Sequence, residues 1–105
     1  MSNEPAEFQL TVPESVAGDP DAVEMLRLWV SRGEPVMAIK PAFADPRAYG
    51  DILAIAARNI AYVYHAQKGL DEEATYRLIL SGLKQSLEGP GYKTVAEKTD
   101  PESAA

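Results

Sequence analysis

The sequence predicts an α+β fold, in which a small two- or three-stranded sheet packs against three helices. Short runs of alternating or β-branched residues near the start are typical of strands, and the long periodic apolar segments that follow are typical of helices. The expected order is strand, helix, strand, long helix, helix. The length of 105 residues fits one domain, which we place at residues 1–90, with a polar, flexible tail over residues 91–105.

The first expected strand is Glu7–Val12, where apolar and polar side chains alternate, and an extended arm is the alternative. A loop over residues 14–18 follows. Asp19 and Pro20 then have the character of a helix start, as N-cap and first helical residue, and Gly33 is the natural stop. One arc of this expected helix is apolar: Ala22, Val23, Met25, Leu26, Trp29 and Val30.

A second strand and a long helix are expected in the middle of the chain. The strand is Pro35–Lys40, whose nearly continuous apolar character favours burial on both faces. Asp45 and Pro46 repeat the helix-start pattern, and the long helix runs to Lys68, with Gly69 as its end. Apolar side chains cover most of its circumference, so we expect it to be covered from more than one direction, by a sheet, a helix or a second subunit. Its charged side chains share one narrow stripe: Arg47, Asp51, Arg58, His65 and Lys68.

The third expected helix begins after Asp71, which is a favourable N-cap, and it buries one narrow apolar stripe. Gly89, Pro90 and Gly91 end it. After this break, Tyr92–Val95 either adds a short strand or docks loosely.

A homodimer is expected from two of these features. A two-stranded sheet is marginal alone, so the helices shield it, the tail adds a strand, or a symmetric partner extends it. The long helix also carries more apolar surface than one neighbour covers. The alternative is a monomer whose outer helices and sheet suffice to cover the long helix.

Composition excludes several classes of function. The 16 acidic and 10 basic residues give a net charge of −6, which argues against nucleic-acid binding, where Lys and Arg supply most of the affinity. The absence of cysteine excludes disulfides and thiolate chemistry and fits a reducing compartment. No run approaches the roughly 18 apolar residues of a membrane span, and the first residues lack the pattern of a secretory signal. We therefore expect a cytoplasmic protein without membrane contact.

No catalytic, cofactor-binding or metal-binding motif is present in the sequence. His65 is the single histidine, so a two-histidine metal site is excluded, and its place on the charged stripe favours a solvated surface residue. Phosphate-binding glycine loops and the common hydrolase motifs are absent. We expect no enzymatic activity and no cofactor.

Arg58, Asn59 and Tyr62 form the one group that we regard as a candidate ligand or partner contact. A cation, an amide and a ring converge there on the long helix. For Asn59, the simpler interpretation is an amide that bonds to backbone or to a neighbouring tyrosine.

The segments above also resemble a small family of uncharacterised proteobacterial proteins, known as a domain of unknown function. The matching residues cover roughly Pro13 to Gly89. They are Asp19-Pro20, Ala22, Glu24, Arg27, Trp29, Gly33, Val36–Ile39, Asp45-Pro46, Gly50 and Ala57-Arg58-Asn59-Ile60-Ala61. The resemblance implies a compact bacterial α+β domain with no established activity, so no functional residue is carried over. Family members often have His where this chain has Asn59, and this departure from the family pattern argues against acid–base chemistry at the position.

The leading hypothesis is a non-enzymatic interaction or regulatory module that self-associates through the long helix. The expected partner is a second copy in a homodimer, and the other candidate is an unidentified protein. Arg58 and Asn59 would fix the register of the contact. The side chains buried against the partner would be Tyr49, Ile52, Ile60, Val63 and Tyr64. The alternative is a protein that binds a small anionic ligand, or an accessory enzyme domain, with its site beside Arg58, Asn59 and Tyr62.

Overall fold

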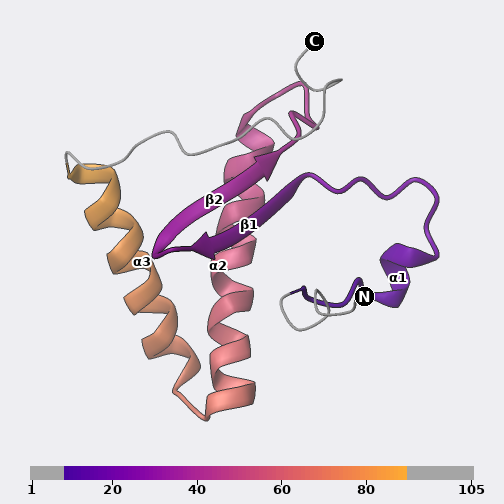
Figure 1. Ribbon diagram of the computed structural model, residues 1–105. Helices are drawn as coiled ribbons and strands as arrows, with labels where there is room; N and C mark the ends of the chain where they lie inside the picture. The colour runs from indigo at the N-terminus through magenta and orange to yellow at the C-terminus, as the bar shows by residue number, and fades with distance from the viewer. Residues whose placement is uncertain (1–8, 90–105) are drawn as a thin grey trace.

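The computed structural model describes residues 9–89, and its class is α+β as predicted. Figure 1 shows a β-hairpin and a pair of long helices, preceded by a single helical turn. The order is helix, two strands, two helices, which differs from the predicted order. The elements are α1 (Glu14–Ala17), β1 (Leu26–Ser31), β2 (Glu34–Ile39), α2 (Arg47–Lys68) and α3 (Glu72–Glu88).

The region before β2 is where the predictions were wrong. The helix expected between Asp19 and Gly33 is instead an irregular segment followed by β1. The loop expected over residues 14–18 contains α1, where the N–H of Ala17 donates to the Pro13 carbonyl at 3.0 Å. Residues 9–12 belong to no strand, and the rest of the expected strand Glu7–Val12 lies outside the described residues.

The hairpin turns through two residues with positive φ, Arg32 (55°) and Gly33 (77°). Two such residues make a type I′ turn, whose twist matches that of the flanking strands. It brings β2 antiparallel to β1, with Leu28 opposite Met37 and Trp29 opposite Val36. The predicted strand Pro35–Lys40 is therefore confirmed to within one residue. Its expected burial on both faces is not found, since its residues are half-buried or exposed.

Both long helices end at the predicted residues, and α2 begins at Arg47, one residue later than predicted, with Pro46 rather than Asp45 as its N-cap. At the start of α2, the Asp45 carboxylate accepts a hydrogen bond from the Arg47 N–H at 3.0 Å. Gly69 ends the helix in the left-handed conformation (φ 74°), and its N–H donates to the His65 carbonyl. Asp71 caps α3 by accepting the Ala74 N–H at 2.9 Å. The expected third helix is thus confirmed, with its last residue immediately before Gly89. Its apolar stripe is not buried as predicted, since Leu83 is 52% exposed and Leu87 is 67% exposed.

The helices α2 and α3 pack on each other through small side chains. Ala61 is completely buried, and Ala57 and Thr75 are each 7% exposed. These three are the buried residues of the described part of the chain, and none of its large side chains is fully buried. Figure 1 shows the helices joined by a tight turn and diverging towards their other ends. Coverage of α2 from more than one direction is therefore incomplete within a single chain.

Tyr49 connects the hairpin to α2. Its hydroxyl hydrogen-bonds to the backbone carbonyl of Lys40, just after β2, and lies 3.3 Å from the carbonyl oxygen of Met25, just before β1. The edge of the Phe43 ring meets the Tyr49 ring at 5.4 Å between centroids. Within residues 9–89, β1 and β2 pack along neither long helix. The predicted shielding of the sheet by helices is therefore not present in one chain. The expected boundary at residue 90 and the segment Tyr92–Val95 lie outside the described residues.

Candidate functional site: the uncovered apolar surfaces

One side of α2 carries an apolar row with heptad-like spacing. Its positions are four and three residues apart in alternation, as in the seam of a coiled coil. We call this row the α2 seam: Tyr49, Leu53, Ala56, Ile60 and Val63. At about 100° per residue, these five positions fall within roughly 80° of the helix circumference.

Exposure varies from residue to residue along the α2 seam. Tyr49 and Ala56 are half-buried, and the Tyr49 hydroxyl bonds to the Lys40 carbonyl in the connection from the hairpin. Further along, Ile60 is 47% exposed and Val63 is 44% exposed. Leu53 is 54% exposed. An apolar row that stays this open on a chain with so small a core is typical of a protein–protein contact.

The predicted contact group is divided between different environments. Arg58 faces α3, where its guanidinium lies over the Tyr76 ring, 3.6 Å from the centroid, and donates to Glu73 at 3.2 Å. The amide of Asn59 donates to the Ile55 carbonyl at 2.9 Å, one turn earlier on the same helix. Tyr62 is 55% exposed. The ring that meets the cation is thus Tyr76 of the neighbouring helix, a pairing that spacing along one helix does not reveal.

His65 holds the turn between the two helices. Its Nδ1 lies 2.9 Å from the carbonyl oxygen of Leu70. A nitrogen at this distance from a carbonyl acts as the donor, so the other ring nitrogen is an acceptor in the neutral ring. The described residues contain no group of three or more His, Cys, Asp or Glu side chains placed to hold a metal ion. Nor do they include a helix that is both long and apolar enough to span a bilayer.

The hairpin has one face made entirely of apolar side chains, which the sequence analysis did not anticipate. Residues opposite each other in the register share a face. We call the six residues of this face the apolar hairpin face: Leu26, Leu28, Val30, Pro35, Met37 and Ile39. Val30 is 80% exposed and Leu28 is 59% exposed. The signal for this face was the alternation of Leu26, Leu28 and Val30, which the helical interpretation of residues 20–32 concealed.

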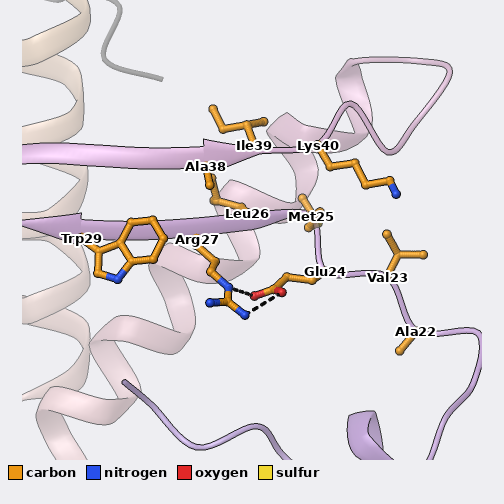
Figure 2. Close-up of a pocket in the computed structure, with 10 residues that line it drawn as sticks. All are labelled: Ala22, Val23, Glu24, Met25, Leu26, Arg27, Trp29, Ala38, Ile39 and Lys40. Carbon is orange, nitrogen blue, oxygen red and sulfur yellow. Dashed lines mark hydrogen bonds and ion pairs between the residues drawn. The ribbon is translucent and has the colours of Figure 1, made fainter. Parts of the chain in front are cut away.

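The opposite face of the hairpin lines a shallow hollow (Figure 2). Arg27 and Trp29 project from the same side of β1, and the Glu24 carboxylate reaches Arg27. The Arg27 guanidinium donates to Glu24 through two nitrogens, and this hydrogen bonding lowers the pKa of Glu24 below its ordinary value of 4.5. Lys40 borders the same hollow. The hollow therefore offers one amine and one guanidinium that is already paired.

A solved structure from the photosynthetic bacterium Rhodopseudomonas palustrus has a similar fold. It is described as that of a candidate pyruvate dehydrogenase. The two chains are 30% identical, with a TM-score of 0.68, and the match covers 88% of this chain and 95% of that chain. The two chains are therefore of similar length. No curated protein matches the sequence.

A family model covers most of the described chain and agrees with the resemblance found in the sequence. It matches residues 9–91. This range includes the hairpin, both long helices and the α2 seam. The chain belongs to the family described as "Domain of unknown function (DUF5076)".

Proposed function

We propose that this chain is a non-enzymatic interaction module that self-associates through the α2 seam. The observation that carries the proposal is the two-sided character of α2. One side is closed by α3 over Ala57 and Ala61, while Leu53, Ile60 and Val63 on the seam stay about half exposed.

The energetics of folding support a partner. Ordering each residue costs about 1–2 kcal/mol in backbone entropy, and folded chains offset this cost chiefly by burying large apolar side chains. Completing the burial of one half-exposed Leu or Ile stabilises by about 1 kcal/mol. A second copy that packs its own seam against the first buries the same residues twice, because a two-fold contact uses one patch on both subunits.

The proposal is tested by the mass and stability of the intact chain in solution. We expect light scattering after size exclusion to give twice the chain mass of 11.4 kDa at high micromolar concentration. The midpoint of thermal unfolding should rise with protein concentration, as it does when association stabilises the folded state. A single-chain mass at that concentration, with a midpoint that does not depend on concentration, overturns the proposal.

A matched pair of variants locates the contact on α2. Ile60→Glu places a charge on the seam, whereas Ile55→Glu places the same charge about 140° around the helix. Ile55 is 60% exposed and Ile60 is 47% exposed, so the two substitutions perturb the single chain to a similar degree. We expect Ile60→Glu to move the mass towards that of one chain and Ile55→Glu to leave it unchanged. Equal effects contradict a contact at the seam.

A second candidate function is supported by the description of the structural neighbour and by the hollow of Figure 2. In this alternative, the chain binds a small carboxylate such as pyruvate beside Lys40. The pairing of Arg27 with Glu24 leaves Lys40 as the available cation of the hollow. Chemical-shift changes at Trp29 and Lys40 on addition of pyruvate, lost in Lys40→Gln, are the expected result. Unchanged spectra at millimolar pyruvate exclude this alternative.

A further inference from the structure

The two edges of the hairpin differ in their capacity to bind another strand. The N–H of Lys40 donates to the Met25 carbonyl, and hydrogen-bonded pairs alternate with non-hydrogen-bonded pairs along an antiparallel ladder. The opposed pairs Leu26–Ile39, Leu28–Met37 and Val30–Pro35 are therefore non-hydrogen-bonded. Their backbone N–H and C=O groups point outward, to the two edges of the hairpin.

The outer edge of β2 is interrupted by proline. Pro35 occupies one of its three outward positions, where its missing N–H costs the hairpin no bond but removes a donor from the edge. Pro41 follows directly after Lys40 and limits extension of the strand. The outer edge of β2 thus has the features by which proteins prevent a further strand from pairing.

The outer edge of β1 has no such protection. Its outward positions are Leu26, Leu28 and Val30, each with a free backbone donor and acceptor by the alternation above, and none is charged or proline. Within residues 9–89, β1 pairs with β2 alone. The side chains of these same residues belong to the apolar hairpin face. One strand therefore presents an open edge and an exposed apolar face together.

We infer that the outer edges of β1 from two copies pair antiparallel about a two-fold axis at Leu28. The result is a four-stranded sheet in the order β2, β1, β1, β2, with the two apolar hairpin faces continuous across the axis. Leu28 then exchanges backbone hydrogen bonds with Leu28 of the second copy, and Leu26 lies opposite Val30. Closing the edge in this way also removes an exposed template for aggregation.

The charges along β1 favour this register. On the other face of the sheet, Arg27 falls directly opposite Trp29 of the second copy. A guanidinium beside an indole ring is a favourable cation–π pair, and no two like charges face each other across the axis. Because the pairing uses only six residues, it is marginal alone. The inference therefore rests on the proposed function, in which the α2 seam holds the two copies together.

The N-terminal segment of the same chain is the competing occupant of this edge. Gln9, Leu10 and Val12 line a hollow together with Leu26 and Leu28. Leu10 is 97% exposed, so this segment approaches β1 without docking against it. The hollow beside the outer edge of β1 is thus open. Residues 9–12 bring two apolar side chains to it, whereas a second copy of β1 brings three.

Cysteine cross-linking tests the pairing directly, because the chain has no cysteine of its own. Opposed residues of a hydrogen-bonded pair have Cα atoms about 5.5 Å apart, within the range that a disulfide spans. Leu28→Cys should therefore give a cross-linked dimer in a glutathione redox buffer. Met37→Cys is the matched control on the outer edge of β2. In the proposed four-stranded sheet, the two copies of this position lie three strand spacings apart, about 14 Å, which is too far for a disulfide.

A proline pair tests the backbone contribution. Leu28→Pro and Met37→Pro each remove one outward N–H from opposed positions of the same hairpin. We expect Leu28→Pro to weaken dimerisation about tenfold or more, from the loss of two symmetric hydrogen bonds, and Met37→Pro to change it less than about twofold. Circular dichroism shows whether each variant folds. If Leu28→Pro does not fold, the cross-linking of Leu28→Cys decides between the outcomes.

The outcomes separate this inference from the proposed function. Equal cross-linking of Leu28→Cys and Met37→Cys overturns the edge pairing, while a wild-type dimer that Ile60→Glu dissociates keeps the α2 contact. A disulfide within one chain, formed between Leu28→Cys and Leu10→Cys in a double variant, assigns the edge to the N-terminal segment and also overturns the pairing. A wild-type chain that sediments as a monomer overturns both.

Discussion

The guanidinium of Arg58 lies over the ring of Tyr76, with its central carbon 3.6 Å from the ring centroid. This contact joins α2 to α3 on the side of the buried alanines, and the same guanidinium donates to Glu73 at 3.2 Å. The side chains of Arg58 and Glu73 are 49% and 55% exposed. Solvent screens an ion pair at that exposure, and such pairs contribute little. Stacking is therefore the stronger part of the contact.

We predict that Arg58→Ala lowers the free energy of unfolding by about 1 kcal/mol, from the loss of the cation–π contact and of the packed side-chain stem. Glu73→Gln should change it by less than about 0.5 kcal/mol. Arg58→Lys, which keeps the charge but not the planar group, should fall between them. Urea denaturation at one fixed protein concentration measures all three. A larger loss for Glu73→Gln than for Arg58→Ala shows that the ion pair dominates instead.

A second prediction concerns the close approach of α2 and α3 at Ala61, which is completely buried. Leu at this position forces the helices apart, so Ala61→Leu should destabilise the chain by about 1–3 kcal/mol. Ala66→Leu is the matched control, because Ala66 is exposed on the same helix and the same substitution there displaces nothing. Thermal unfolding at equal concentrations compares the two variants. Equal midpoints mean that α2 and α3 do not pack at Ala61 as described.

The helical half of the fold could be predicted from the sequence because its signals agree with each other. Asp71 caps α3, Gly69 supplies the left-handed end of α2, and the apolar residues within each helix recur with the helical period. The tertiary fold adds nothing that contradicts these local preferences, so local chemistry determines the elements.

The first strand could not be predicted because two patterns overlap. Residues 22–30 satisfy a helical spacing, and Asp19 with Pro20 supplies a plausible start, although Asp19 in fact accepts the N–H of Asp21 in an irregular segment. The distinguishing feature was the two-residue turn at Arg32 and Gly33. Asn-Gly or Asp-Gly is the strong signal for such a turn, whereas Arg adopts positive φ only rarely.

The sequence identifies the residues of the candidate contact group, but it does not predict how their side chains are arranged. Arg58, Asn59 and Tyr62 are close together on one helix, and spacing alone suggests a common site. Their partners come from elsewhere: Arg58 meets two side chains of α3, and Asn59 bonds to the backbone of its own helix. Contacts between helices depend on the crossing geometry, which a single sequence does not encode locally.

A third prediction concerns pH at the start of α2. The Asp45 carboxylate accepts hydrogen bonds from the Arg47 side chain, at 2.9 and 3.1 Å, and from the Arg47 backbone N–H. These bonds lower the pKa of Asp45 below its ordinary value of 3.8, the side-chain bonds contributing most. Because the folded pKa is depressed, the stabilisation is complete above pH 3.8 and is lost as the pH falls through the lowered pKa.

Carbon NMR of the Asp45 carboxyl group measures this effect. We expect its titration midpoint to lie below 3.8 in the wild type. Arg47→Gln removes the guanidinium but keeps the backbone donor, so the pKa should rise part of the way back to its ordinary value. A midpoint that is the same in wild type and variant means that the Arg47 side chain does not hold the carboxylate in solution.

The last prediction concerns the hairpin turn, where Arg32 has a φ of 55° and Gly33 a φ of 77°. The left-handed conformation costs a residue with a Cβ about 1–2 kcal/mol, and this cost is lower for asparagine. Arg32→Asn creates the preferred sequence for a type I′ turn and should raise the free energy of unfolding by about 0.5–1 kcal/mol. Gly33→Ala should lower it by about 1–2 kcal/mol for the same steric reason. Because β1 carries the proposed edge contact, the two substitutions should shift cross-linking of Leu28→Cys in the same directions as stability. If Arg32→Asn stabilises the chain while cross-linking falls, the hairpin and the edge contact are not coupled in this way.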